Sequence, residues 1–154
     1  MVYRPAIGQP RVLLVVSHPA VGSGVETLLR LERRYDVRRV ARLADAVRIA
    51  RSWPADAALV DASILPPGDR LSLGVPAMVL AGAEADGGPA ARSLDDARGW
   101  VRKDAAATEL VAAVERLLTG ARQSAAGSLA VFAVGVLVVV LEGLLGYLLW
   151  LALV

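Results

Sequence analysis

The stretch AALVDAS, residues 57–63, is a short apolar run that ends in a single carboxylate, Asp61. A run of this length and composition predicts a buried strand. In α/β proteins the functional side chains gather where parallel strands end, so a strand that ends in an acid can present a nucleophile or a metal ligand. Whether Asp61 has such a role depends on the residues at the ends of the neighbouring strands.

Segments of the same kind recur through residues 11–120. Strands that alternate with helices predict an α/β fold with a parallel sheet covered on both faces. Strand-like runs cover 11–16, 35–41, 55–63, 75–82 and 99–103, and helical apolar spacing covers 24–34, 43–53 and 107–120. The residues expected at the carboxyl ends of the strands are Ser17, His18, Asp61, Ala81, Gly82 and Lys103.

The composition excludes several kinds of site. The 154 residues include no cysteine and one histidine, His18, which excludes disulfides, cysteine metal sites and zinc sites built on several histidines. The net charge of +2 is too balanced to indicate nucleic-acid binding. Lys103 is the only lysine among many arginines, which favours a compact ammonium over a planar guanidinium at that position. We expect no cofactor and no metal ion.

The last part of the chain, residues 128–154, is apolar except for Glu142. Its length exceeds the roughly 20 residues that a helix needs to cross a bilayer. Arg116 and Arg122 precede the run and no charged residue follows it, so the positive-inside tendency places residues 1–127 in the cytoplasm. We therefore expect a single-pass, tail-anchored protein of the cytoplasmic (inner) membrane. Its expected parts are an N-terminal extension (1–10), a head domain (11–120), a linker (121–127) and a transmembrane helix (128–154).

Three segments of the head resemble the receiver domains of response regulators, in the subfamily that normally carries a LuxR-type (NarL-type) helix-turn-helix. RVLLVVSHPAVGSGVETLL (11–29) is similar to the opening strand and helix, and ALVDASILPPGD (58–69) to the phospho-acceptor strand and the loop after it. ARGWVRKDAAATELVAAVERLLTG (97–120) is similar to the closing strand and helix and is the most specific of the three.

The resemblance implies a flavodoxin-like (CheY-like) five-stranded parallel sheet of order 2-1-3-4-5. It also implies that Asp61 matches the phospho-acceptor and that Lys103 matches the lysine that pairs with the phosphoryl group. The segment PPGDRLSLG (66–74) is too short for a full third helix, so we expect shortened third and fourth helices.

The departures from the family indicate a degenerate receiver, or pseudo-receiver. The family's two magnesium-binding acids match Val16 and Ser17, and its phosphoryl-binding hydroxyl matches Ala81. Phosphoryl transfer to a carboxylate needs a metal to neutralise the developing charge, and Asp61 alone is a poor ligand set for a hard cation. The switch aromatic matches Trp100, a bulkier ring that turns inward less easily. Two interpretations stay open for Asp61 and Lys103: a structural ion pair, or a pocket that still accepts a phosphoryl group.

Arginines are concentrated between Arg30 and Arg51, a segment that contains eight arginines and three acids. A solvated surface is the simplest explanation. In a tethered head the same surface could instead rest on anionic lipid, at about 1 kcal/mol per basic residue. Nucleic acid is not an expected partner, because the membrane span replaces the helix-turn-helix. The candidate lipid-facing residues are Arg33, Arg34, Arg38, Arg39 and Arg42.

Small residues and the one acid of the predicted transmembrane helix fall within one stripe. Small residues let another helix approach closely, and a carboxylate at membrane depth is costly unless it is protonated or paired. A partner helix, in a homodimer or a larger membrane complex, would satisfy Glu142, whereas a protonated Glu142 facing lipid is the alternative. The stripe contains Gly135, Val139, Glu142, Gly143 and Gly146.

These features predict a membrane-anchored pseudo-receiver that acts through protein contacts in signalling or regulation, and not as an enzyme. One alternative is an accessory subunit of a membrane complex, with the receiver fold as a cytoplasmic cap. A further alternative is a working phosphorelay receiver, phosphorylated at Asp61.

Overall fold

The computed structural model describes residues 8–120. The chain divides into two units, Met1–Ala121 and Arg122–Val154, and the described residues belong to the first. No helix within residues 8–120 is long and apolar enough to cross a membrane. The predicted linker, the predicted transmembrane helix and its stripe of Gly135, Val139, Glu142, Gly143 and Gly146 lie outside the described residues.

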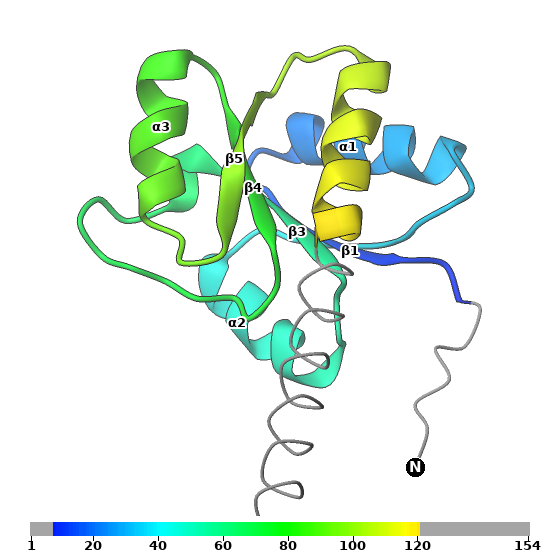
Figure 1. Ribbon diagram of the computed structural model, residues 1–154, viewed down its shortest axis with the longest axis horizontal. Coiled ribbons are helices and arrows are strands. Elements are labelled where there is room, and N and C mark those ends of the chain that lie inside the picture. Colours follow the sequence, from blue (N-terminus) through cyan, green and yellow to red (C-terminus); the bar gives the residue numbers. More distant parts are fainter. Residues whose placement is uncertain (1–7, 121–154) are drawn as a thin grey trace, which may run out of the picture. The chain divides into compact units, whose positions relative to one another are not determined.

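The centre of the head is a five-stranded parallel sheet (Figure 1). Its order is β2-β1-β3-β4-β5, which confirms the predicted topology. Each strand is five or six residues long and lies within or close to its predicted run. The strands are β1 (Arg11–Val15), β2 (Asp36–Val40), β3 (Ala57–Asp61), β4 (Ala77–Ala81) and β5 (Ala97–Arg102).

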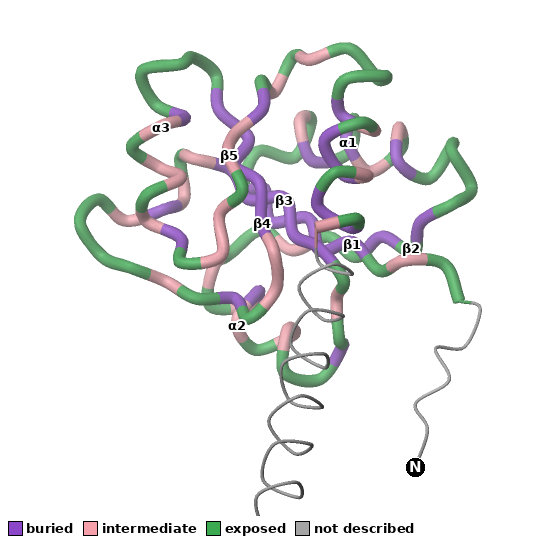
Figure 2. Tube along the Cα trace, viewed as in Figure 1, coloured by how far each residue is buried: buried purple, intermediate pink, exposed green. Residues whose placement is uncertain are grey.

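Both faces of the sheet are buried, because side chains on the central strands alternate between two apolar layers. Val12 and Leu14 of β1 belong to one layer, and Leu13 and Val15 belong to the other. Figure 2 shows the buried residues following the strands through the middle of the head. This pattern explains why the inner strands are continuous apolar runs and do not alternate with polar residues.

Helices cover the two faces in pairs. One layer includes residues of α1 (Pro19–Leu31) and of the helix over 107–120. The other layer includes residues of α2 (Leu43–Ser52) and α3 (Glu84–Arg92). Helix α1 begins earlier than predicted, because Pro19 has a fixed backbone angle that suits the first helical turn.

The connection from β3 to β4 is the main irregularity of the head. A single 3-10 turn, η1 (Ala62–Ile64), stands where an α/β crossover normally places a helix. The rest of the connection, residues 65–76, is a loop with one isolated bridge from Leu71 to Leu94. The expected shortening of the third helix is therefore confirmed, since only η1 stands in its place. The helix labelled α3 follows β4, in the position of the predicted fourth helix, and has nine residues.

Candidate functional site

The carboxyl ends of β3, β4 and β5 place Asp61 and Lys103 beside each other. Asp61 is the last residue of β3, and Lys103 follows the last residue of β5. The backbone N–H of Lys103 donates to the carbonyl of Ala81, the last residue of β4, at 2.9 Å. The sheet ladder thus fixes the backbone from which the lysine side chain reaches across β4 to the aspartate.

Asp61 is buried and its carboxylate is asymmetrically bonded. Its Oδ1 accepts three hydrogen bonds: from the Lys103 ammonium at 2.6 Å, from the Ser63 N–H at 2.9 Å and from the Ser63 hydroxyl at 2.8 Å. Its Oδ2 is buried and has no partner among the described residues. The Asp61 side chain is 1% exposed and that of Lys103 is 25% exposed, so the pair lies at the edge of the interior.

The protonation state of Asp61 follows from these contacts. Burial raises the pKa of the Asp61 carboxyl, but the hydrogen bonds from Lys103 and Ser63 and the charge of Lys103 outweigh burial. The net effect lowers the pKa of Asp61 below its ordinary value. Asp61 is therefore an anion at neutral pH, with the adjacent ammonium as its counter-ion.

The residues around Asp61 do not fit a magnesium ion. Val16, which matches one of the family's metal-binding acids, is 2% exposed and packs in the apolar layer of α1. Ser17, which matches the other, is exposed. Within residues 8–120 no group of three or more histidine or acidic side chains could hold a metal ion. A hard octahedral cation would find one carboxylate here, already engaged by an ammonium.

The residues that match the family's switch positions are the buried Ala81 and the half-buried Trp100. Ala81 is fully buried and offers no hydroxyl to a phosphoryl group. The Trp100 ring packs in the α2–α3 layer and against Gly87 of helix α3, where a Cβ atom would lie 2.6 Å from Cγ and 2.8 Å from Cε3 of the ring. Because Gly87 leaves room for it, the ring is held between β5 and α3.

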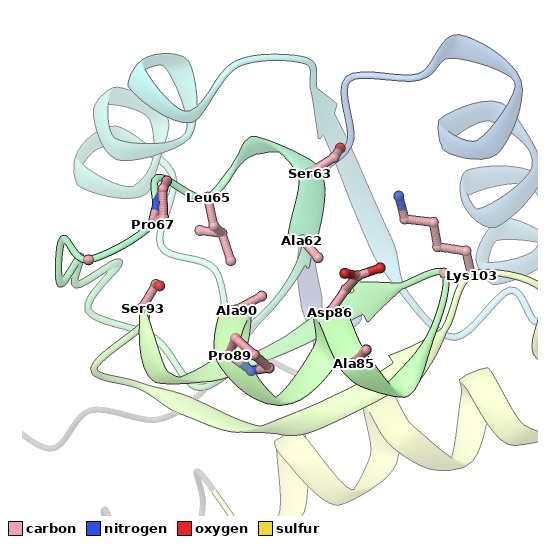
Figure 3. Close-up of a pocket in the computed structure, with 12 residues that line it drawn as sticks. Ala62, Ser63, Leu65, Pro67, Ala85, Asp86, Pro89, Ala90, Ser93 and Lys103 are labelled. Atoms are coloured by element: carbon pink, nitrogen blue, oxygen red, sulfur yellow. The ribbon is translucent and has the colours of Figure 1, made fainter.

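A cavity of about 490 Å³ lies between the η1 connection and helix α3 (Figure 3). It occupies the side of the head where the third crossover helix is missing. No sequence motif indicates this cavity, because a cavity depends on how loops pack. Its lining consists of Ala62, Ser63, Leu65, Pro67, Gly68, Gly82, Ala85, Asp86, Pro89, Ala90, Ser93 and Lys103.

The candidate lipid-facing arginines divide between the two faces of the edge strand β2. Arg38 lies over the Trp53 ring, 4.9 Å from its centroid. Its neighbour Arg39 turns to the opposite face and pairs with Glu26 of α1, its Nε 3.3 Å from Oε2. Lipid binding by these residues stays a prediction.

The other three candidate arginines lie in the turns that flank β2. Arg33 follows α1 and has a left-handed backbone, with φ of 52°. Arg34 pairs with Glu115 of the helix over 107–120. Arg42 stands directly before α2. The five side chains therefore do not form one continuous face, and two of them, Arg34 and Arg39, already have acidic partners.

The solved structures that resemble this chain include receiver domains of response regulators. No protein-family model and no curated protein matches the sequence. Among solved structures, the signal receiver domain of NarL from Mycobacterium tuberculosis is 24% identical, with 73% of this chain and 98% of that chain covered and a TM-score of 0.60.

A LuxR-family two-component response regulator from Aurantimonas is 25% identical, covering 73% and 87% of the two chains, with a TM-score of 0.61. A CheY-like receiver domain protein from Methanospirillum hungatei is 15% identical, covering 76% and 99%, with a TM-score of 0.60. At identities this low the matches establish the receiver fold, and the geometry around Asp61 carries the functional argument.

Proposed function

We propose that this chain is a membrane-anchored pseudo-receiver that acts through protein contacts in signalling or regulation, without magnesium-dependent phosphorylation of Asp61. The receiver fold of its structural neighbours supports a regulatory role. The membrane anchor is supported by the apolar run of residues 128–154. A head held in the cytoplasm by this anchor would meet partners at the membrane surface.

One observation carries the proposal: the positions matched to the family's two metal-binding acids, Val16 and Ser17, supply no carboxylate beside Asp61. An attacking carboxylate oxygen needs a free approach to phosphorus and a cation that neutralises the incoming oxygens. Here Oδ1 is engaged by three donors and Oδ2 is buried. Lys103 is the only cation in contact with Asp61 among the described residues, and Val16 and Ser17 offer no further carboxylate that could hold a metal ion to neutralise the incoming oxygens.

The second candidate function is an accessory subunit of a membrane complex. The stripe around Glu142 favours it, because a carboxylate at membrane depth is stabilised by a partner helix. The two candidates differ in where the partner binds. A signalling module binds its partner through the head, whereas an accessory subunit depends on the tail.

Extraction of the full chain from membranes in mild detergent, followed by identification of co-purifying chains, tests both. The main proposal predicts a partner that is retained by the wild type, by Asp61→Asn and by the double variant Glu142→Leu/Gly143→Leu. The accessory-subunit function predicts that the double variant loses the partner. A partner that binds only after treatment with acetyl phosphate, and never to Asp61→Asn, would contradict the proposal.

A further inference from the structure

The cavity between η1 and α3 has two chemically different parts. One part is mainly apolar and includes Leu65, Pro67, Pro89 and Ala90, with the Ser93 hydroxyl on the same side. The other end carries the polar side chains of Ser63, Asp86 and Lys103. Its volume of about 490 Å³ lies within the roughly 300–1,000 Å³ of ordinary ligand sites.

The charges around the cavity leave one acid uncommitted. The Lys103 ammonium and the Ser63 hydroxyl both donate to Asp61, so Lys103 and Asp61 balance each other. Asp86 is exposed and forms no ion pair within residues 8–120. It stands in the first turn of α3, where the helix dipole favours a negative charge. Of the two charged residues that line the cavity, Lys103 has an ion-pair partner, and Asp86 has none within residues 8–120.

A guanidinium group on an aliphatic stem complements this arrangement. The planar fork of arginine matches a carboxylate with two parallel hydrogen bonds, and its methylene stem packs well on apolar surface. Figure 3 shows the Asp86 carboxylate on the side of α3 that faces Ala62 and Ser63, with Pro67 and Pro89 farther along the cavity. An arginine that lay along the cavity with its guanidinium at Asp86 would place its stem beside the prolines.

We propose that this cavity is the docking site for an arginine side chain presented by a partner protein, with Asp86 as its counter-ion. The inference rests on the proposed function, because it names the chemistry of the partner that a contact-based regulator would bind. In this proposal, the space left open by the missing third helix receives a side chain from another protein.

The test uses the full chain in neutral detergent micelles and follows backbone amide shifts during titration with N-acetyl-argininamide. The matched control ligand is N-acetyl-citrullinamide, which has nearly the same shape and no charge. We expect saturable shifts in the millimolar range, concentrated in residues 62–68 and 82–93, and at least about fivefold weaker binding of the citrulline compound. Equal binding of the two compounds, or no saturable shift, would overturn the inference.

Two variants localise the effect. Asp86→Asn should weaken arginine binding by about three- to fivefold, since it keeps the shape of the side chain and removes its charge. Glu84→Gln removes a charge from the same exposed turn, at a residue that does not line the cavity, and should change binding less than about twofold. Equal losses in both variants would mean a diffuse electrostatic attraction and would refute a site at Asp86. Unchanged amide shifts elsewhere show that each variant is folded.

The outcome is separable from that of the proposed function. Phosphorylation of Asp61 would refute the pseudo-receiver proposal without affecting a measured arginine site. A titration without saturable amide shifts would refute the arginine site without affecting the pseudo-receiver proposal.

Discussion

Replacement of Lys103 by methionine should strongly destabilise the head, because it leaves the buried Asp61 anion without a counter-ion. Breaking one side of a buried ion pair typically costs about 3–5 kcal/mol. We expect about 3 kcal/mol here, at the low end, because Ser63 keeps two donors on Oδ1 and Lys103 is 25% exposed. For a domain of this size, a loss of about 3 kcal/mol lowers the melting temperature by about 10 °C.

The double variant Asp61→Asn/Lys103→Met separates the contribution of the ion pair to stability from the contribution of lysine-stem packing. It removes the charge together with its counter-ion, so it should be more stable than Lys103→Met alone by about 1–2 kcal/mol. Thermal unfolding followed by near-ultraviolet circular dichroism in mild detergent measures all four members of this cycle. If Lys103→Met melts within about 2 °C of the wild type, or if the two single effects simply add, the buried pair does not stabilise the head as we argue.

The contribution of Asp61 to stability should depend on pH in opposite directions in the wild type and in Lys103→Met. In the wild type the pKa of Asp61 is lowered by folding, although burial opposes this, so its contribution to stability is present above the unfolded pKa and is lost as the pH falls. In Lys103→Met, burial is no longer offset by the ammonium and the pKa of Asp61 should rise. Mild acidification should therefore narrow the gap in melting temperature between the variant and the wild type, and a gap that widens on acidification would contradict this account.

Two further predictions concern packing and titration. Gly87→Ala should destabilise the head by about 1–3 kcal/mol, because its Cβ atom would lie 2.6 Å from Cγ of Trp100. Gly88→Ala is the matched control, since its Cβ atom would meet only Arg92 Nη1 at 4.0 Å, and equal melting temperatures of the two variants would refute the packing argument. Burial, and then the hydrogen bond to Glu115 and its charge, raise the pKa of Tyr35 to about 12. The difference in ultraviolet titration between the wild type and Tyr35→Phe should therefore have its midpoint near 12, and Glu115→Gln should lower that midpoint. Because the folded pKa is raised, the stability that Tyr35 contributes is present below its unfolded pKa of about 10 and is lost as the pH rises through the folded value.

The strands were predictable because their apolar runs are continuous and well separated. The parallel order followed from the family resemblance and is confirmed by the hydrogen-bonded register. Helix α3 was not delimited in advance, because its Gly87-Gly88-Pro89 sequence has low helix propensity. The helix forms because tertiary packing overrides that propensity: Gly87 accommodates the Trp100 ring, and Ala90 and Ala91 pack against the adjoining apolar layer.

The candidate site was predictable in part. The pairing of Asp61 with Lys103 could be inferred from the strand ends, but the role of Ser63 was missed. An aspartate that accepts the N–H two residues later forms an Asx-type turn, so the Asp61-Ala62-Ser63 order held a usable signal. The arginine-rich segment was harder to interpret, because the alternation along β2 sends Arg38 and Arg39 to opposite faces.

The state of Asp61 is the central claim, and intact-protein mass spectrometry tests it most directly. The full chain and Asp61→Asn are incubated with acetyl phosphate and Mg²⁺, beside a receiver domain that has both metal-binding acids as the positive control. The account predicts a phosphoryl mass increment in the control domain and none in either form of this chain. An increment in the wild type that disappears in Asp61→Asn would contradict it.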